Sequence, residues 1–324
     1  MSEASTGQLL GDVGGTNIRL AWQATVNAPI ERIRVFPCSE YPGIEQAIKD
    51  YLNVECLPVP SHCALGIANP VTGDSIRMTN HSWSFSQESL RQYFGFRRLV
   101  VLNDFTALAL ALPNLNSQLL VQLGGKTAVS HAPKALIGPG TGLGVSGLIY
   151  NEHASLWTPI SGEGGHVTLA VQTDEEFGVL KLIRRRYGHV SAERVLSGPG
   201  LVDLYLALRE YRGAGGKEIS GAQEITAMAL DQKDPLATQT LELFTAFLGS
   251  VAGDLALTLG ARGGVYIGGG IMPRLLDWLP HSPLRTRFES KGRFKSYLQE
   301  IPVWIINSPT SPALEGAAQA LHMA

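Results

Sequence analysis

Two glycine-rich segments of the same design, far apart in the chain, constrain this sequence most. Residues 8–22 pass from an apolar start through Gly11-Asp-Val-Gly-Gly-Thr-Asn17 to an alternating apolar end, and residues 135–150 repeat that plan around Gly138-Pro-Gly-Thr-Gly-Leu-Gly144. An apolar run, a glycine turn and a second apolar run predict strand, tight turn, strand. We interpret the segments as two copies of one phosphate-binding hairpin, because two facing loops can clamp a polyphosphate and one cannot.

Chain length and charge narrow the class of protein. With 324 residues, 44% of them hydrophobic, the chain is long enough for two domains with cores of their own. The 26 Lys and Arg residues nearly balance the 28 Asp and Glu residues, which leaves a net charge of −2. This balance gives no broad electrostatic surface for nucleic acid or for an anionic membrane. We therefore expect a small-molecule partner.

The start of the chain and its cysteines indicate a cytoplasmic location. The sequence begins without the basic start and apolar run of a secretory signal, and its most apolar later region, 241–271, is interrupted by Asp254 and Arg262. Cys38, Cys56 and Cys63 form no CxxC pair, so neither a disulfide framework nor a zinc knuckle is expected.

The apolar periodicity gives a coarse map of the elements. We expect strands and helices in alternation and a first domain over 1–112, with a tail, 309–324, that packs back on it; the second domain covers 113–308. The expected strands are 63–68, 99–104 and 264–268, and the expected helices are 41–52, 105–112, 174–187, 200–211, 235–260 and 311–323.

The first hairpin carries groups that suit ATP phosphates. Gly11, Val13, Gly14 and Gly15 expose backbone, the Thr16 hydroxyl can bind phosphate oxygens, and Asp12 offers a carboxylate for a Mg²⁺-bound water. The alternative is an ordinary hairpin turn, because Asp and Gly are common turn residues. The second hairpin favours the functional interpretation.

The second loop offers Gly140 and Thr141 for phosphate and Gly142 beside them, and it also contains two misleading patterns. Residues 142–147 satisfy G-x-G-x-x-G, but an apolar β-branched run follows where a dinucleotide fingerprint needs a helix. Residues 120–127 end like a phosphate-binding P-loop, but Leu120 stands where the first glycine should be. Neither motif is supported.

A third glycine cluster spans 263–270 and follows an apolar strand run. Backbone without side chains at Gly269 and Gly270 can approach the flat face of a base or a ribose. A closely packed turn between strand and helix is an equally good interpretation.

Asp104 is the candidate catalytic base. It follows Asn103 at the end of the apolar strand 99–104, where a carboxylate beside an amide is well placed to take a proton from an attacking hydroxyl. The alternative is that Asp104 is the N-cap of a helix that begins at Phe105.

Three further side chains suit a polyol. Glu163 and His166 lie three apart among glycines, and together they offer the acceptors and donor that neighbouring sugar hydroxyls need. A zinc site is not expected, because no second His and no Cys is near them. Glu193 is a weaker candidate, since it could pair with Arg194 on the surface.

Taken together, these segments resemble the proteobacterial-type glucokinases of the hexokinase and actin-like ATPase superfamily. The resemblance runs in consistent order from about residue 9 to beyond residue 295. Its motifs are residues 11–17, 78–85, 102–107, 138–144, 161–166, 191–200 and 263–270.

The resemblance implies an α/β, two-lobed, actin-like ATPase fold (ribonuclease H-like) with a central interlobe cleft. It implies a cytoplasmic homodimer that passes the γ-phosphoryl group of MgATP to the 6-hydroxyl of glucose, the first step of glycolysis. The alternatives are a kinase for another hexose and a sugar-sensing ATPase of the same fold.

The resemblance also implies a role for each candidate. Asn103 would bind ring hydroxyls, and Asp104 would bind and deprotonate the 6-hydroxyl. Glu163, His166 and Glu193 would contact hydroxyls near the anomeric end. The loop 11–16 would hold the ATP phosphates, and 140–142 both phosphate and sugar. The related repressor and kinase family has a zinc-binding cysteine cluster after its His, and this sequence lacks one after His166. We therefore expect no structural zinc and no DNA-binding arm.

Overall fold

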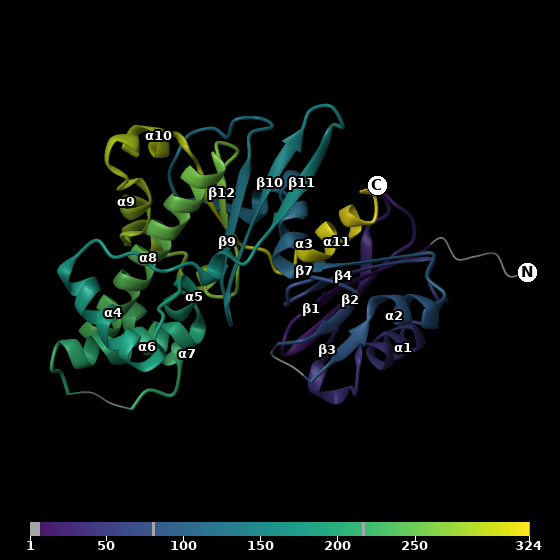
Figure 1. Cartoon of the computed structure of the whole chain (residues 1–324), viewed down its shortest axis with the longest axis horizontal. Helices are drawn as coiled ribbons and strands as arrows, with labels where there is room; N and C mark the ends of the chain where they lie inside the picture. Colours follow the sequence, from purple (N-terminus) through teal and green to yellow (C-terminus); the bar gives the residue numbers. More distant parts are fainter. Residues whose placement is uncertain (1–6, 80–81, 216–217, 324) are drawn as a thin grey trace, which may run out of the picture. The chain divides into compact units, whose positions relative to one another are not determined.

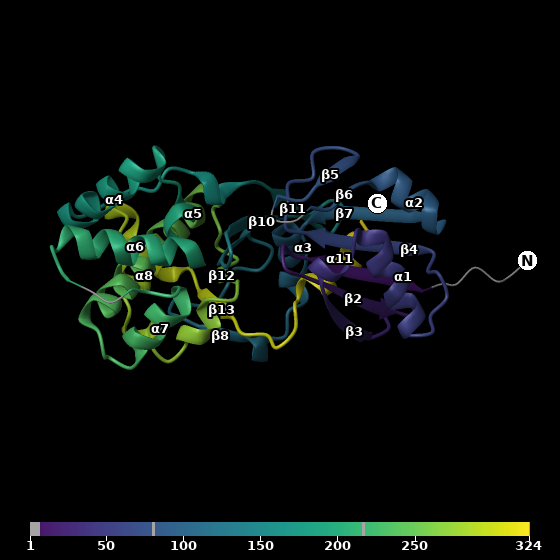
Figure 2. The ribbon, with the colours of Figure 1, turned by 90° about the horizontal axis from the view of Figure 1, so that it is seen from below.

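The structure is a computed structural model that describes residues 7–79, 82–215 and 218–323. The chain forms two compact units, each with a mixed α/β composition and a sheet of its own (Figures 1 and 2). The first unit comprises Met1–Asn116, Trp157–Ser161 and Ser308–Ala324, and the second comprises Ser117–Leu156 and Gly162–Asn307. Asn80 and His81, within the motif 78–85, lie outside the described residues.

Five strands form the sheet of the first unit, in the order β3-β2-β1-β4-β7. Strands β1, β2 and β3 are antiparallel neighbours, whereas β1, β4 and β7 run parallel, with α1 in the connection from β3 to β4 and α2 in that from β4 to β7. The elements of this unit are β1 (Gln8–Val13), β2 (Asn17–Gln23), β3 (Ile30–Pro37), α1 (Ile44–Val54), β4 (His62–Ile67), β5 (Ser75–Arg77), β6 (Ser84–Ser86), α2 (Gln87–Phe94), β7 (Arg98–Asn103), α3 (Asp104–Ala111) and α11 (Ala313–Ala320).

Strand β1 is buried along its whole length because helices cover both faces of the sheet. Leu9 and Val13 pack into the core that α1 and α2 share, and Leu10 packs with Leu314 and Ala317 of α11. Figure 1 shows α1 and α2 on one side of this sheet and α3 and α11 on the other. A central strand covered on both faces reads as a continuous apolar run, which is what the sequence has here.

The sheet of the second unit follows the same plan. Its strands run in the order β10-β9-β12-β13-β8, with β9 antiparallel to β10 and parallel to β12. In both units, therefore, the first strand of a glycine hairpin pairs with its hairpin partner on one side and with a parallel strand on the other. The strands are β8 (Leu120–Gln122), β9 (Lys134–Pro139), β10 (Leu143–Asn151), β12 (Val265–Ile267) and β13 (Val303–Ile306); β11 (Leu156–Ser161) crosses from the second unit into the first.

Helices pack around α8 in the second unit. This long helix is mostly buried and contacts α6, α7 and α9. Among the described residues it is the single helix long and apolar enough to cross a membrane, but 72% of its most apolar window is buried, as in a core helix. The helices are α4 (Asp174–Tyr187), α5 (Ala192–Val195), α6 (Gly198–Tyr211), α7 (Ala222–Leu230), α8 (Pro235–Leu259), α9 (Leu284–Glu289) and α10 (Lys295–Glu300).

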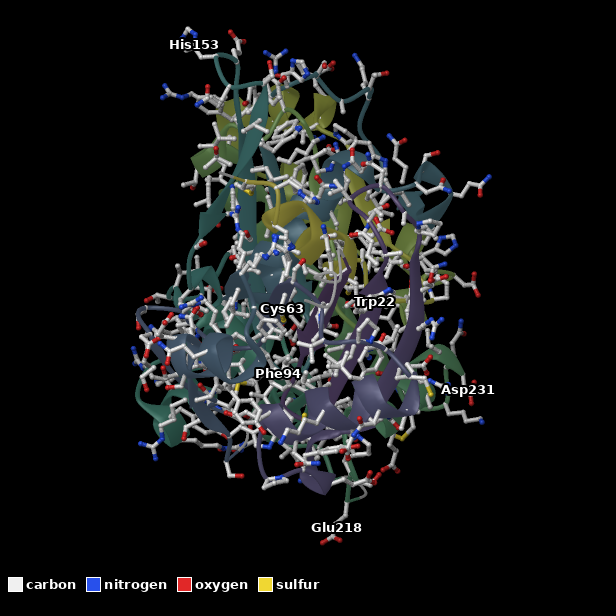
Figure 3. All side chains as sticks on the ribbon, turned by 90° about the vertical axis from the view of Figure 1, so that its right-hand side faces the viewer. Trp22, Cys63, Phe94, His153, Glu218 and Asp231 are labelled. Atoms are coloured by element: carbon white, nitrogen blue, oxygen red, sulfur yellow. The ribbon has the colours of Figure 1, made fainter. Side chains whose placement is uncertain are left out.

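The predicted strands and helices are confirmed to within a few residues at their ends. Residues 143–147 are the first half of β10, so the G-x-G-x-x-G pattern opens no helix and rejection of the dinucleotide motif is confirmed, and residues 120–127 contain β8 and no helix. The sequence did not predict β3, which is exposed along most of its length, or the short elements β5, β6, β8, β11, β13, α2, α5, α7, α9 and α10. Cys38, Cys56 and Cys63 are free thiols. Cys63 on β4 and Trp22 on β2, both labelled in Figure 3, are buried.

Candidate active site

The turn of the first hairpin is braced by Cys38. The Gly14 N–H donates to the carbonyl oxygen of Asn17 at 2.9 Å and closes the turn. The Cys38 N–H donates to the Thr16 carbonyl oxygen at 2.8 Å, and its thiol donates to the Gly14 carbonyl oxygen at 3.6 Å. Burial raises the pKa of this thiol, which keeps it protonated as a donor. Gly15 is half-buried and Thr16 is exposed, so this turn presents backbone and a hydroxyl at the surface.

Gly11, Asp12 and Val13 precede this turn and are buried inside β1. A Cβ atom on Gly11 would lie 2.5 Å from the Cδ2 atom of Leu65, so glycine makes room for packing there. The Oδ2 atom of Asp12 forms an ion pair with the Nη1 atom of Arg19 at 3.2 Å. A carboxylate beside a turn that exposes backbone and a hydroxyl fits Mg²⁺, which proteins hold through one or two carboxylates with substrate phosphates and water.

Asn103 and Asp104 lie at the same sheet edge as the first turn. Val13, Ile67 and Asn103 are in register across β1, β4 and β7. Parallel strands end at one edge of a sheet, and ligands of open α/β sheets bind beyond their carboxyl ends. Gly66 lets α3 approach β4 closely, because a Cβ atom on it would lie 3.1 Å from the Cβ atom of Ala107.

The N-cap of α3 is Asn103. Its side-chain oxygen accepts hydrogen bonds from the N–H groups of Phe105 at 2.9 Å and Thr106 at 3.2 Å. The alternative that Asp104 caps a helix starting at Phe105 is therefore wrong: Asp104 is itself the first helical residue. Its Oδ1 atom accepts from the Phe105 N–H at 2.9 Å, and a carboxylate in the first turn is favoured by the helix dipole.

The second turn has a similar closure. The Gly140 N–H donates to the Gly142 carbonyl oxygen at 2.8 Å, and the Gly140 carbonyl oxygen accepts from the Gly198 N–H, also at 2.8 Å. Thr141 is exposed at its tip. A Cβ atom on Gly142 would lie 2.5 Å from the Oε2 atom of Glu193, so this position must stay glycine for that carboxylate to keep its place.

Glu193 is directed to the second turn and does not pair with its neighbour. Its Oε2 atom accepts a hydrogen bond from the Leu143 N–H at 2.8 Å, and its Oε1 atom lies 3.9 Å from the Nδ1 atom of His166. The Arg194 guanidinium instead lies 4.0 Å from the centre of the Tyr187 ring. The alternative of a surface pair between Glu193 and Arg194 is wrong.

Glu163 and His166 flank a single short turn, Gly164–His166. The His166 N–H donates to the Glu163 carbonyl oxygen at 3.0 Å, and both side chains are exposed. The turn packs on the second hairpin, since a Cβ atom on Gly165 would lie 2.2 Å from the carbonyl oxygen of Leu143.

The third glycine cluster reaches the same hairpin. Gly269 has φ of +81°, and a Cβ atom on it would lie 2.2 Å from the Pro139 carbonyl oxygen. Glycine is thus required there by conformation and by close packing. Gly270 is exposed with open space around it.

The candidates thus form two groups, one in each unit, and each group is described by itself. In the first unit the turn 14–16, Asp12, Asn103 and Asp104 lie at the ends of neighbouring strands. In the second unit, Glu163, His166, Glu193 and Gly269 gather around the turn 140–142.

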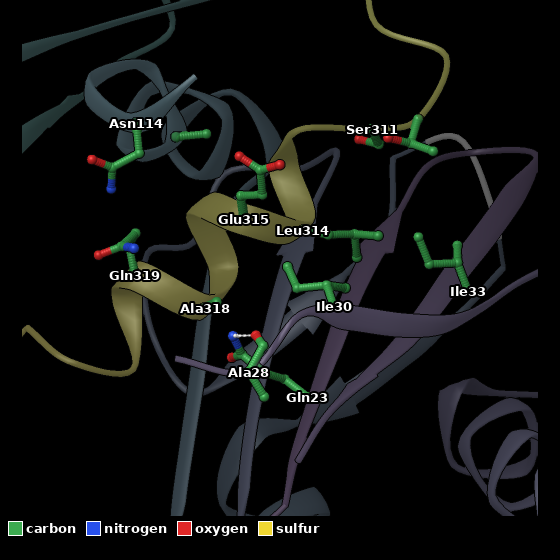
Figure 4. Close-up of a pocket in the computed structure, with 12 residues that line it drawn as sticks. Gln23, Ala28, Ile30, Ile33, Asn114, Ser311, Leu314, Glu315, Ala318 and Gln319 are labelled. Carbon is green, nitrogen blue, oxygen red and sulfur yellow. Dashed lines mark hydrogen bonds between the residues drawn. The ribbon is translucent and has the colours of Figure 1, made fainter. Parts of the chain in front are cut away.

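A pocket of about 330 Å³ lies elsewhere in the first unit, between α11 and the β2–β3 hairpin (Figure 4). Gln23, Ile30, Leu314 and Glu315 line it, and none of the predicted site residues does. Burial raises the pKa of the Glu315 carboxyl. This pocket belongs to no predicted function of the chain.

Within residues 7–79, 82–215 and 218–323, no three His, Cys, Asp or Glu side chains gather as a metal site.

The sequence did not indicate the supporting roles of Gly66, Cys38 and Gly198. A glycine inside the buried strand 63–68 is a usable signal for close approach of another backbone. The sequence around Cys38 and Gly198 offers no such signal.

Comparisons with known proteins give one family over nearly the whole chain. A family model described as Glucokinase matches residues 9–324. A curated glucokinase from Aromatoleum aromaticum is 51% identical over 318 residues, which are 98% of this chain and 95% of that protein.

Solved structures agree as well. The glucokinase from an Antarctic psychrotroph has a TM-score of 0.86 at 36% identity, over 98% of this chain and 99% of that one. A ROK family glucokinase from Streptomyces griseus, in complex with glucose and AMPPNP, has a TM-score of 0.64 at 19% identity, over 97% of this chain and 98% of that one, and shares the fold. These likenesses confirm the predicted fold class.

Proposed function

This chain belongs to the glucokinase family, and we propose that it transfers the γ-phosphoryl group of MgATP to the 6-hydroxyl of glucose with Asp104 as the catalytic base. It is an enzyme, a kinase that uses glucose and ATP. The observation that carries the assignment of the base is the register of Val13, Ile67 and Asn103, which brings the end of the first hairpin strand and Asp104 to one sheet edge.

In this proposal the ATP phosphates are held by the two hairpin turns. The backbone and hydroxyl of 11–16 bind phosphate oxygens in the first unit, and Gly140 and Thr141 do so in the second, with Gly269 and Gly270 beside the nucleoside. Asp12, whose Oδ2 atom is paired with Arg19, would hold Mg²⁺ through a water. Bound Mg²⁺ would neutralise charge on the phosphates.

The sugar is held by side chains from both units. Asn103 and Asp104 bind hydroxyls on the side of the reacting carbon, while Gly142, Glu163, His166 and Glu193 meet the hydroxyls near the anomeric carbon. Asp104 takes the proton of the 6-hydroxyl as its oxygen attacks the γ-phosphorus, and ADP leaves. The surroundings of Asp104 support this role, because the carboxylate sits at the first turn of α3 and is half-buried.

We extend the proposal to the arrangement and setting of the enzyme. The domains 1–112 with 309–324, and 113–308, act as two lobes that close on the substrates and exclude water, which would otherwise accept the phosphoryl group. The family resemblance supports a cytoplasmic homodimer that acts at the first step of glycolysis.

The test is a panel of hexoses in an assay of ATP consumption and sugar 6-phosphate formation. We expect ATP turnover that depends on glucose, with fructose, mannose and N-acetylated sugars as weaker acceptors. Faster turnover with one of those sugars would assign the kinase to another hexose. ATP hydrolysis that is independent of every sugar would favour a sugar-sensing ATPase and contradict the proposal.

A further inference from the structure

The turn 140–142 is held at both ends by the segment that carries Glu193. At one end the Gly140 carbonyl oxygen accepts from the Gly198 N–H at 2.8 Å. At the other end the Leu143 N–H donates to the Oε2 atom of Glu193 at 2.8 Å. Because α5 is a single helical turn directly before α6, one short stretch of chain supports the whole phosphate loop.

The carboxylate of Glu193 has its two oxygens in different surroundings. Oε2 is engaged by the Leu143 backbone, whereas Oε1 faces His166, 3.9 Å from its Nδ1 atom. The side chain of Glu193 is 34% exposed and that of His166 is 60% exposed, so the pair is accessible to a ligand. One carboxylate therefore borders both the group of sugar-binding candidates and the phosphate loop.

The carbonyl oxygen of Leu143 is also packed against, in this case by the turn that lies between Glu163 and His166. A Cβ atom on Gly165, in the turn between Glu163 and His166, would lie 2.2 Å from the Leu143 carbonyl oxygen. The main chain directly after the phosphate loop thus lies between two segments that carry sugar-binding candidates. Both segments therefore contact the main chain at the end of the loop directly.

We propose that Glu193 is a positioning residue as well as a sugar contact: it couples occupancy of the sugar site to the conformation of the 140–142 phosphate loop. The inference rests on the proposed function. A sugar hydroxyl that bonds Oε1 fixes the carboxylate, and Oε2 then fixes the Leu143 N–H and the loop that precedes it. The nucleotide pays less for ordering the loop, so each ligand strengthens binding of the other.

The test is calorimetric titration of the whole protein with AMPPNP and Mg²⁺, without glucose and with glucose raised to saturation for each variant. For the natural sequence we expect glucose to tighten AMPPNP binding about fivefold or more. Glu193→Ala should bind AMPPNP more weakly without glucose and should lose the response to glucose. Glu193→Gln should keep the affinity without glucose, because its amide oxygen can still accept from the Leu143 N–H.

Two variants control for a general effect on α5. Gly142→Ala places a Cβ atom 2.5 Å from the Oε2 atom of Glu193 and should reproduce the binding behaviour of Glu193→Ala with the carboxylate still present. Arg194→Ala changes the adjacent residue, which packs on Tyr187, and should leave the coupling intact. If Glu193→Ala does not fold, Gly142→Ala alone decides the question.

The inference is overturned if Glu193→Ala, or Gly142→Ala in its place, binds AMPPNP as the natural sequence does without glucose, or keeps the full response to glucose. That result leaves the proposed function intact as long as the natural sequence phosphorylates glucose. Absence of glucose phosphorylation by the natural sequence would instead overturn the proposed function itself.

Discussion

A Cβ atom on Gly316 would lie 1.6 Å from the carbonyl oxygen of Ala107, so α11 and α3 meet backbone to backbone. No side chain fits between them at this point. Because α3 begins at Asp104, the helix near the end of the chain helps to set the position of the candidate base.

Gly316→Ala should therefore destabilise the first unit and impair turnover. Forcing the two helices apart costs about 1–3 kcal/mol or more of unfolding free energy, and a displaced α3 moves the Asp104 carboxylate. Urea denaturation and glucose 6-phosphate formation measure the two effects. Gly73→Ala is the matched control, since a Cβ atom there has nothing within 4 Å. Equal urea midpoints for both variants would contradict the close contact.

The capping role of Asn103 can be separated from its proposed contact with sugar. Asn103→Ala removes the acceptor for Phe105 and Thr106 and should cost about 1 kcal/mol of unfolding free energy. Asn103→Asp keeps the capping oxygen but loses the amide donor. That amide also donates to the Asn69 carbonyl oxygen at 3.5 Å. Asn103→Asp should therefore lose less stability than Asn103→Ala while the KM for glucose rises. If Asn103→Asp has an unchanged KM, the amide does not donate to the sugar.

Asp104→Ala tests the catalytic base directly. Loss of the proton acceptor should lower kcat by about 10²–10⁴-fold, while AMPPNP binding stays close to that of the natural sequence. Asp104→Asn is the structural control, because its side-chain oxygen can still accept from the Phe105 N–H, which lies 2.9 Å away in the natural sequence. Its kcat should fall as well. A near-normal kcat in either variant would show that another group takes the proton.

Local signals in the sequence were sufficient to predict most of the longer helices and both glycine hairpins. Residues 174–187 were predicted as a helix with the bounds of α4, and in the structure Thr173 is its N-cap and Gly188 its C-cap. The glycine hairpins were predicted because a turn between two apolar runs is also a local pattern. The N-cap of α3 was harder, since Asn103 and Asp104 are adjacent and both residue types cap helices well.

The contacts that support the candidate site could not be predicted, because they join residues far apart in the chain. Glu193 illustrates this: its nearest charged neighbour in sequence is Arg194, yet its hydrogen-bond partner is the backbone of Leu143. Every residue type except proline has the same backbone N–H, so no sequence pattern could indicate that Leu143 is the donor. The contact of Gly316 with Ala107 is hidden for the same reason.

Stability of the first unit should fall in mild acid partly because of His322. Partial desolvation, with the charges of Arg98 and His62 beside it, lowers the pKa of this imidazole in the folded chain below its ordinary value of about 6.5. The unfolded state then binds the proton more readily, so stability present at neutral pH is lost as pH falls below about 6.5. In urea titrations from pH 7 to pH 5, His322→Gln should lose less stability than the natural sequence. Equal losses would contradict this role.

The buried ion pair of the second unit gives the sharpest prediction about stability. Arg287 binds both carboxylate oxygens of Glu176, and the two side chains are only 13% and 2% exposed. Glu176 also accepts from the Gln172 N–H at 2.7 Å, and Arg287 donates to the Ser250 hydroxyl at 3.1 Å. The pair thus joins α4, α8 and α9 inside the unit.

Removing one partner should cost far more than removing both. Arg287→Met leaves a buried carboxylate without its cation and should lower the unfolding free energy by about 3–5 kcal/mol. The double variant Arg287→Met, Glu176→Leu should recover most of that loss. Burial of apolar residues of similar volume avoids the free-energy cost of removing a charge from water. Lys126→Ala breaks an exposed ion pair in which the Nζ atom of Lys126 lies 2.8 Å from the Oε1 atom of Glu300. It should lower the unfolding free energy by less than about 1 kcal/mol. If the single and double variants unfold at the same urea concentration, the cost lies in lost packing around Arg287 rather than in the isolated charge of Glu176.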